Sequence, residues 1–429
     1  MLWIIKDKQF KSLLTGGGKS FLIKGGGSVL GIIVLSILTN ELGSIQSGYY
    51  FTVFSLFTVG LTIGTMGLTN TVLKLVSVNY SKSDYSVANK AVYKSIILSS
   101  ILCTSLSISI FIGSSLISIV IFEDIVYQNI LILFSIALPF WAVSQIIGYA
   151  IQGLNRVSLS FALTGPALNL ILLLLFFYDN PKSAEMASSY FIISNVIVCC
   201  LSIYYWAKLR KVGGQGRVSY KKIISSSMPI AISKVFFQIS NNAAILYLAF
   251  WFTPSDVAFF AVCTRVAGII GLVIDAMNRF ISPQIAVMFA KGKVEELESL
   301  VSKTISILIL ITLPIFIITL IIPNYILSIF GNDFEGAAAV LIVVILGQVL
   351  NSFFGPVANI LVMTGNEKYY RNANMISSTL AILIGILLVS NLGSIGAAIM
   401  YSSTLFITNY YCWYCVREKV GLKFSLMKF

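Results

Sequence analysis

Four polar residues stand at helical spacing in an otherwise apolar stretch just past the middle of the chain. They follow the i, i+4, i+7, i+8 pattern that places side chains on one face of a helix: Lys234, Gln238, Asn241 and Asn242. A lysine at the centre of a bilayer costs about 2.5–3.5 kcal/mol, so this face must turn to water or protein rather than to lipid. We interpret the four residues as the lining of a water-filled cavity. A buried packing seam between helices is the alternative.

Two more cations, Lys24 and Arg265, lie in apolar stretches. No carboxylate lies at matching depth beside Lys234 or Arg265, so the sequence predicts that an anion visits them. A pyrophosphate or an acidic sugar fits this chemistry. For Lys24, snorkelling of the side chain to the inner membrane edge is an equal alternative. The run Gly25-Gly26-Gly27 beside it predicts a bend or break in the first helix.

The other motifs are interpreted as structural. Asp275 and Arg279, four residues apart, are expected to form a local helical ion pair. Cys412-x-x-Cys415 lies in a helix rich in Tyr and Trp without a second pair, which indicates packing residues rather than a redox or metal site. The chain has no histidine, the commonest metal ligand. We therefore expect no catalytic and no metal-binding residue, and we do not expect an enzyme.

The elements that position these residues are membrane helices. Hydrophobic residues make up 57% of the 429 and charged residues 10%, with a mean hydropathy of +0.92. A soluble domain of this length would need more charge to cover its surface. Because a bilayer core requires about 20 apolar residues per helix, the long apolar runs predict about twelve spans. They lie near residues 21–41, 48–73, 95–121, 128–151, 159–178, 187–207, 223–250, 256–278, 304–328, 337–363, 373–391 and 394–415.

The distribution of Lys and Arg predicts the orientation of these spans. With the N-terminus in the cytoplasm, 24 of the 29 Lys and Arg residues fall in cytoplasmic segments. The outer loops hold one cation, Lys182, and half of the 16 acidic residues. The positive-inside rule therefore favours an even number of spans with both termini in the cytoplasm. The net charge of +13 is mostly a signal of topology and implies no nucleic-acid partner.

The chain divides into two related halves at its most basic loop. Lys24 aligns with Lys234 at an offset of 210 residues, and Arg156 aligns with Lys368 at an offset of 212. Six spans in each half give the repeats one common orientation, as in transporters with parallel repeats and a site at their interface. We predict an all-α membrane protein with two pseudo-symmetric six-helix bundles, residues 1–210 and 223–429, joined by a basic cytoplasmic linker at 211–222.

Three stretches carry a family resemblance. The first contains Gly48-Tyr49-Tyr50 and ends at Asn70, the second runs from Met228-Pro229 through Arg265 to Ala286, and the third from Phe330 to Ala398. In these stretches the chain resembles the polysaccharide-repeat flippases of the superfamily that also holds multidrug exporters and lipid II flippases. The resemblance implies alternating access between two six-helix bundles. It also implies that spans one, two, seven and eight line a cationic groove containing Lys24, Lys234 and Arg265.

The expected function is that of a flippase in a bacterial cytoplasmic membrane. It would move undecaprenyl-pyrophosphate-linked oligosaccharides of O-antigen or capsule type from the inner to the outer leaflet, without a cofactor and beside polysaccharide polymerase machinery. Coupling to Na⁺, to H⁺ or to the membrane potential stays open, and Asn241 and Asn242 could serve a sodium ion or a helix contact. A cation-coupled multidrug exporter of the same fold is the alternative, with Asp275 as its inner acid. A membrane glycosyltransferase or polymerase would need a large outer loop, which the predicted spans do not leave.

Overall fold

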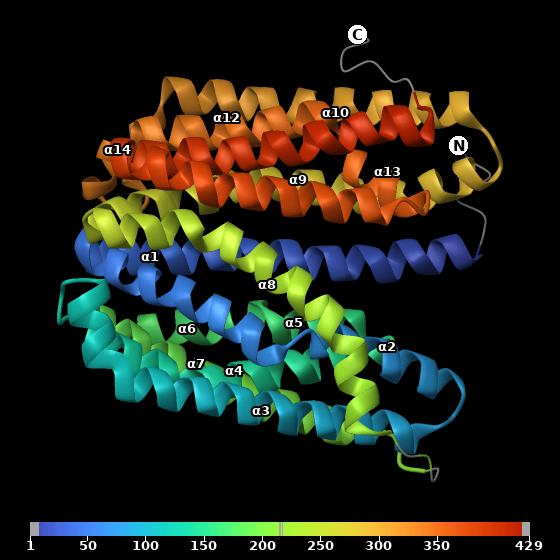
Figure 1. Ribbon diagram of the computed structural model, residues 1–429, viewed down its shortest axis with the longest axis horizontal. Helices are drawn as coiled ribbons and strands as arrows, with labels where there is room; N and C mark the ends of the chain where they lie inside the picture. Colours follow the sequence, from blue (N-terminus) through green and yellow to red (C-terminus); the bar gives the residue numbers. More distant parts are fainter. Residues whose placement is uncertain (1–7, 214–215, 217, 423–429) are drawn as a thin grey trace. The chain divides into compact units, whose positions relative to one another are not determined.

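The computed structural model describes residues 8–213, 216 and 218–422, and all regular structure among them is helical (Figure 1). The side chains of residues 8–22, Lys24 and Arg279 lie outside this description. The first half of the chain contains α1 (Lys8–Thr65), α2 (Leu68–Ser81), α3 (Tyr85–Leu116), η2 (Ile117–Ile121), α4 (Tyr127–Gly153), α5 (Val157–Thr164), α6 (Pro166–Tyr178) and α7 (Ala184–Leu209). The second half contains α8 (Tyr220–Trp251), α9 (Pro254–Ala290), α10 (Val294–Ile321), α11 (Pro323–Ser328), η3 (Asn332–Ala337), α12 (Ala338–Phe354), α13 (Val357–Met363), α14 (Glu367–Cys415) and η4 (Val416–Val420).

The described helices account for about twelve membrane spans, as predicted. Nine of them are long and apolar enough to cross a bilayer, or ten if the bent pair α5 and α6 forms one span. Two of these, α1 with 58 residues and α14 with 49, are far longer than one span of about 20 residues. Each contains one residue with non-helical backbone angles, Gly43 in α1 and Gly393 in α14, so each consists of two helices.

The two breaks share one sequence, Leu-Gly-Ser-Ile, at residues 42–45 and 392–395. The backbone angle φ is +68° at Gly43 and +53° at Gly393, in the region that only glycine adopts without strain. Of the bend or break expected at Gly25-Gly26-Gly27, the break is absent from the described backbone, because α1 is continuous there. Gly27 serves a different purpose: a Cβ at this position would collide with Pro166, the first residue of α6.

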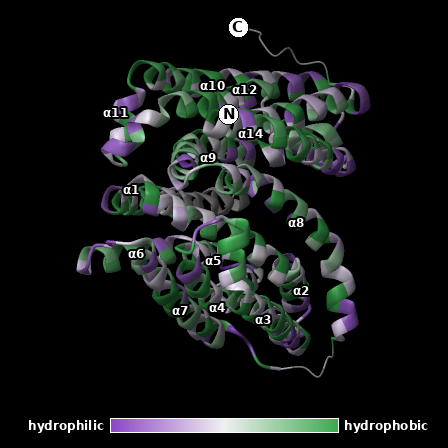
Figure 2. Ribbon diagram, turned by 60° about the vertical axis from the view of Figure 1, so that its left-hand side comes forward, coloured by the Kyte–Doolittle hydropathy of each residue, from purple (hydrophilic) through white to green (hydrophobic). Residues whose placement is uncertain are grey.

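Large apolar side chains are exposed along the described helices. Ile112, Phe177, Leu310 and Ile321 are each more than 70% exposed. In Figure 2 most helical turns are coloured as hydrophobic, and hydrophilic colour gathers at places such as α11 and the start of α8. An apolar exterior around buried backbone hydrogen bonds is what a bilayer requires of a spanning protein. The chain is a multi-pass membrane protein.

The chain forms two compact units. Unit 1 comprises Met1–Leu42 and Val53–Gln238, and unit 2 comprises Gly43–Thr52 and Ile239–Phe429. In unit 1, α4 packs between α3 and α7, and α2 packs on α3 and α4. In unit 2, α12 packs against α9, α10 and α14. These units group residues by contact, and the bundles predicted at 1–210 and 223–429 with a linker at 211–222 stay a prediction.

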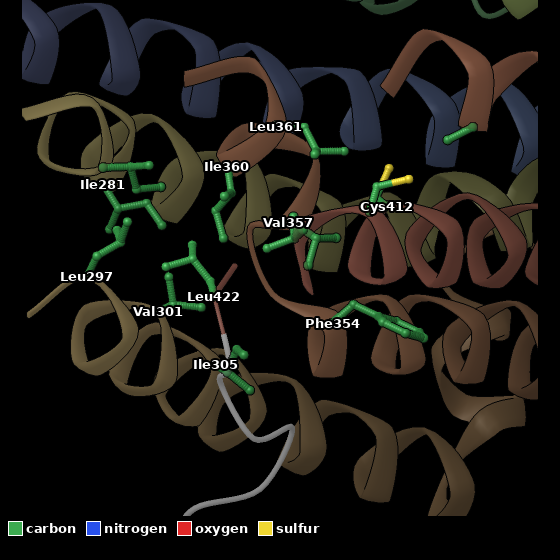
Figure 3. Close-up of a cluster of buried hydrophobic side chains, with 14 of the residues drawn as sticks. Ile281, Leu297, Val301, Ile305, Phe354, Val357, Ile360, Leu361, Cys412 and Leu422 are labelled. Atoms are coloured by element: carbon green, nitrogen blue, oxygen red, sulfur yellow. The ribbon is translucent and has the colours of Figure 1, made fainter. Parts of the chain in front are cut away.

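Each unit has its own apolar core. In unit 1 the core gathers Leu68, Val72 and Val76 of α2 with residues of α3 and α4. In unit 2 a buried cluster joins α9, α10, α13 and α14 (Figure 3). Cys412 and Cys415 are free thiols buried in this second cluster. Their burial among aliphatic side chains is what the interpretation of both cysteines as packing residues predicts.

Candidate binding site

Lys234 lies near the middle of α8, about 21 Å from its first residue at 1.5 Å per residue. Its ammonium group Nζ donates hydrogen bonds to Thr69 Oγ1 at 2.9 Å and to Asn70 Oδ1 at 3.3 Å. It also lies 5.7 Å from the centre of the Tyr149 ring. All three partners belong to unit 1 and are electrically neutral. They solvate the positive charge at this depth without cancelling it, so the site keeps a net positive charge.

The local sequence explains why Thr69 and Asn70 meet this lysine. The second span is interrupted at Met66 and Gly67, where φ is +44° and +67°, and α2 begins directly afterwards at Leu68. Thr69 and Asn70 therefore lie in the first turn of α2. The backbone N–H groups at the start of a helix carry partial positive charge. This end of α2 adds to the positive potential around the Lys234 ammonium.

Gly67 also fixes the distance between α2 and α8. A Cβ at this position would lie 2.6 Å from the carbonyl oxygen of Ser227 and 2.8 Å from the backbone nitrogen of Ala231. Only a glycine permits this approach. Lys234 follows Ala231 by three residues on α8, so this close contact places the ammonium group next to the first turn of α2.

Arg265 lies in α9, about 17 Å from its first residue. Its guanidinium carbon Cζ is 4.4 Å from the centre of the Phe51 ring. Phe51 is 1% exposed and belongs to the Gly43–Thr52 segment, which is part of unit 2. This geometry is a cation–π contact, which stabilises a desolvated guanidinium by about 0.5–2 kcal/mol.

The Gly43–Thr52 segment is fixed at its start by close contacts to unit 2. A Cβ at Gly48 would collide with the carbonyl of Pro254, the first residue of α9. Ser44 Oγ lies 3.2 Å from Ser255 Oγ. The carboxylate of Asp333 accepts hydrogen bonds from Ser44 N at 3.3 Å and Ser44 Oγ at 3.4 Å. These contacts place Phe51, two turns further along α1, against Arg265.

A double-mutant cycle tests the contact between Arg265 and Phe51. We expect Arg265→Gln and Phe51→Leu to show a coupling free energy of about 1–2 kcal/mol in reversible unfolding of the purified protein. The matched cycle combines Arg265→Gln with Phe57→Leu, a phenylalanine that is equally buried but lies in unit 1. Its coupling energy should be close to zero. Equal coupling in both cycles would contradict a specific cation–π contact.

The remaining predicted residues are not all brought together. Gln238 is half-buried in unit 1, whereas Asn241 is exposed and Asn242 is buried in unit 2. Lys24 lies in α1 of unit 1, and its side chain is outside the described part of the chain. The ion pair expected between Asp275 and Arg279 also involves a side chain outside it. A common cavity for the six predicted residues therefore stays a prediction.

Sequence reasoning did not identify Thr69, Asn70, Tyr149 and Phe51 as members of the candidate site. A signal existed for the first two, because the pair Thr69-Asn70, which follows Gly67 after one leucine, is a polar step inside an apolar span. Tyr149 and Phe51 carry no such signal, since aromatic residues are common in this chain. Their relation to Lys234 and Arg265 depends on tertiary packing.

Two family models match the chain. The model described as polysaccharide biosynthesis protein matches residues 13–283, which include Lys234 and Arg265. The model described as MatE matches residues 229–387. A protein of Haloferax volcanii described as the probable low-salt glycan biosynthesis flippase Agl15 is 24% identical over 182 residues. That match covers 42% of this chain and 39% of the relative, so it spans well under half of either protein.

Solved transporter structures share the fold. The lipid II flippase MurJ in an inward closed conformation aligns with a TM-score of 0.74 at 14% identity, over 94% of this chain and 87% of that one. An inward-facing multidrug transporter of the MATE family in the MOP superfamily aligns with a TM-score of 0.73 at 16% identity, over 92% and 94%. A MOP superfamily transporter from Pyrococcus furiosus, whose binding pocket is described as reversed in polarity, aligns with a TM-score of 0.66 at 14% identity, over 96% and 95%. These likenesses confirm the predicted fold class.

Proposed function

The chain belongs to the polysaccharide biosynthesis protein family, and from this premise we propose that it is a flippase for undecaprenyl-pyrophosphate-linked oligosaccharide repeat units. The family assignment confirms the resemblance found in the sequence. In the proposal, repeat units of O-antigen or capsule type move from the inner to the outer leaflet of a bacterial cytoplasmic membrane, where polysaccharide polymerase machinery receives them. The proposal includes the predicted topology, with both termini in the cytoplasm.

The observation that carries this proposal is the Lys234 ammonium group, held near the middle of α8 by neutral partners. Two of its three N–H groups donate to Thr69 and Asn70, and the third can donate to a phosphate oxygen. A pyrophosphate that enters the site gains charge-assisted hydrogen bonds there. Departure is equally feasible, because Thr69 and Asn70 continue to solvate the ammonium when the anion leaves. Reversible binding of this kind is what a translocation site needs.

Arg265 supplies the corresponding cation of unit 2. Its guanidinium stacks on Phe51, and a guanidinium is the side-chain group best suited to bind a phosphate through two N–H groups. In an alternating-access cycle the head group would cross the membrane through the protein while the lipid tail stays in the bilayer. Translocation forms and breaks no covalent bond, so the proposed machinery contains cations and polar side chains but no catalytic residue. A Na⁺ or H⁺ gradient or the membrane potential would drive it.

The second candidate function is a cation-coupled multidrug exporter. The MatE model match over residues 229–387 and the shared fold favour it. The candidate site opposes it, since a cationic drug entering beside Lys234 or Arg265 would meet like charge at low dielectric, where repulsion is strong. The acid considered for ion coupling, Asp275, is exposed on α9.

Reconstitution into proteoliposomes tests the two functions directly. We expect the protein to translocate a fluorescently labelled undecaprenyl-pyrophosphate oligosaccharide and to leave a cationic dye such as ethidium at the rate of protein-free vesicles. The matched probe is the same oligosaccharide on undecaprenyl monophosphate, which carries less charge for the cations to bind and should move several-fold more slowly. Export of the dye without movement of the lipid-linked sugar would overturn the flippase proposal and favour the exporter.

A further inference from the structure

The chain between α7 and α8 is held against the first turns of α3. Ser86, Lys90 and Lys94 stand four residues apart on α3 and so lie on one face of this helix. Ser86 Oγ and Lys90 Nζ both donate to the carbonyl oxygen of Gly216, at 3.2 and 3.0 Å. Lys94 Nζ donates to the carbonyl oxygen of Val218 at 2.8 Å. This stripe of donors fixes the described C-terminal part of the connection.

The N-terminal part of the connection is fixed in the same way. The backbone nitrogen of Lys211 donates to the hydroxyl of Tyr80 at 3.0 Å, and Asn89 Nδ2 donates to the carbonyl of Lys211 at 2.8 Å. The Lys211 ammonium lies 5.5 Å from the centre of the Tyr85 ring. At the other end of the connection, Tyr220 is the first residue of α8, and the centre of its ring lies 4.4 Å from Nζ of Lys94 on α3. Both ends of the connection therefore lie beside the same few turns of α3.

These backbone contacts leave the cations of the two ends exposed. Lys90 and Lys94 donate to backbone carbonyls of the connection. Five other basic residues are exposed at the surface of unit 1: Lys208, Arg210, Lys211, Lys221 and Lys222. We call these five residues the basic cluster. The nearest acid in the sequence of α3, Asp84, accepts a hydrogen bond from the backbone nitrogen of Val87 and so caps this helix.

The loop between α9 and α10 shows that exposed lysines in this protein can be balanced by acids. There, Lys293 forms an ion pair with Glu296 at 2.7 Å, and Glu295 and Glu298 lie on the same first turns of α10. Both connections carry cytoplasmic lysines in the predicted topology. The lysines of the unit 2 loop have acids beside them, whereas residues 208–222, which contain the basic cluster, include no Asp or Glu.

Aromatic and aliphatic side chains beside the basic cluster indicate that it lies at the level of the lipid head groups. Tyr204 and Tyr220 are exposed near the adjoining ends of α7 and α8, and Lys208 Nζ lies 5.9 Å from the centre of the Tyr204 ring. Exposed tyrosines at helix ends are typical of the level of the lipid head groups. Val212, between the two halves of the cluster, is 86% exposed. A valine with this exposure is stabilised if it contacts lipid rather than water.

We propose that the basic cluster is a binding site for the phosphate head group of an anionic phospholipid in the leaflet that surrounds this end of unit 1. The cations supply the charge, and Tyr80, Asn89 and the donor stripe of α3 hold them in one geometry. Val212, Tyr204 and Tyr220 contact the glycerol and upper acyl region of the same lipid. This site is separate from the Lys234 site and independent of what the protein transports.

Lipid retention by the purified full-length protein tests this site. We expect native mass spectra to show at least about tenfold more bound phosphatidylglycerol than phosphatidylcholine after incubation with equal amounts of both. The variant with Lys208, Arg210, Lys211, Lys221 and Lys222 all replaced by glutamine should lose this preference. The matched variant Lys291→Gln with Lys293→Gln, in the loop of unit 2, should keep it. A wild-type protein without a preference, or an equal loss in the matched variant, would overturn the proposal.

A second variant distinguishes a binding site with a fixed geometry from a loose surface charge. It leaves every charged residue in place. Ser86→Ala combined with Asn89→Ala removes two of the hydrogen bonds that fix the connection. We expect several-fold weaker retention of phosphatidylglycerol, because the cations lose their common geometry. Unchanged retention would show that the cluster attracts lipid only as a loose surface charge. A thermal unfolding curve of the same variant checks that unit 1 stays folded.

Discussion

Replacing Lys234 by glutamine is expected to reduce translocation of a lipid-pyrophosphate oligosaccharide by about 10- to 150-fold. This range follows from a hydrogen bond to a charged group, worth about 1.5–3 kcal/mol, with tenfold for each 1.4 kcal/mol. Glutamine keeps donors that can reach Thr69 and Asn70 but carries no charge. The fold of unit 1 should therefore survive while the attraction for pyrophosphate is lost. Initial rates in proteoliposomes measure the effect.

Two control variants isolate the charge of Lys234. Lys234→Arg keeps a cation at this position and should retain a substantial part of the rate. Lys82→Gln removes a cation from an exposed position of unit 1, at the end of α2, and should leave the rate unchanged. An unaffected Lys234→Gln protein would remove this residue from the transport pathway. An equal loss in Lys82→Gln would indicate a general effect of charge on reconstitution or orientation.

The fold could be predicted from the sequence to the extent that bilayer thickness dictates it. Runs of about 20 apolar residues predict spans wherever they occur, because the backbone must be hydrogen-bonded within each helix. The position of a break within such a run could not be predicted in the same way. Three glycines at 25–27 predicted a break, yet α1 continues through them and breaks at Gly43. A glycine permits both a break and a close helix contact, and the neighbouring Pro166 decides between them for Gly27.

The candidate site could be predicted only in part, for a related reason. Lys234 was identified because a cation in an apolar helix is costly, and this cost is visible in the local sequence. Its partners Thr69 and Asn70 precede it by 165 and 164 residues, and only tertiary structure brings them together. The polar stripe predicted one environment for Asn241 and Asn242, whereas one is exposed and the other buried. Neighbouring residues lie about 100° apart around a helix, so a cavity on one side and packing on the other can divide them.

Replacing Gly67 by alanine is expected to destabilise unit 1 by about 2–5 kcal/mol. An alanine at φ of +67° costs about 1–2 kcal/mol, and inserting a methyl group into a closely packed contact costs about 1–3 kcal/mol more. The second contribution arises because the methyl group would lie 2.6 Å from Ser227 O and 2.8 Å from Ala231 N. To relieve this overlap, α8 must move away from α2, and Lys234 moves with it.

Gly365 provides the matched control, because it has φ of +76° but would have no atom within 4 Å of an added Cβ. Gly365→Ala should therefore cost only the backbone contribution of about 1–2 kcal/mol. Reversible unfolding in detergent measures both variants. The transport assay adds a second difference, since Gly67→Ala should slow translocation by displacing Lys234 from Thr69 and Asn70, whereas Gly365→Ala should not. Equal destabilisation by the two alanines would contradict a packing role for Gly67, and full transport activity in Gly67→Ala would show that the site tolerates a displaced α8.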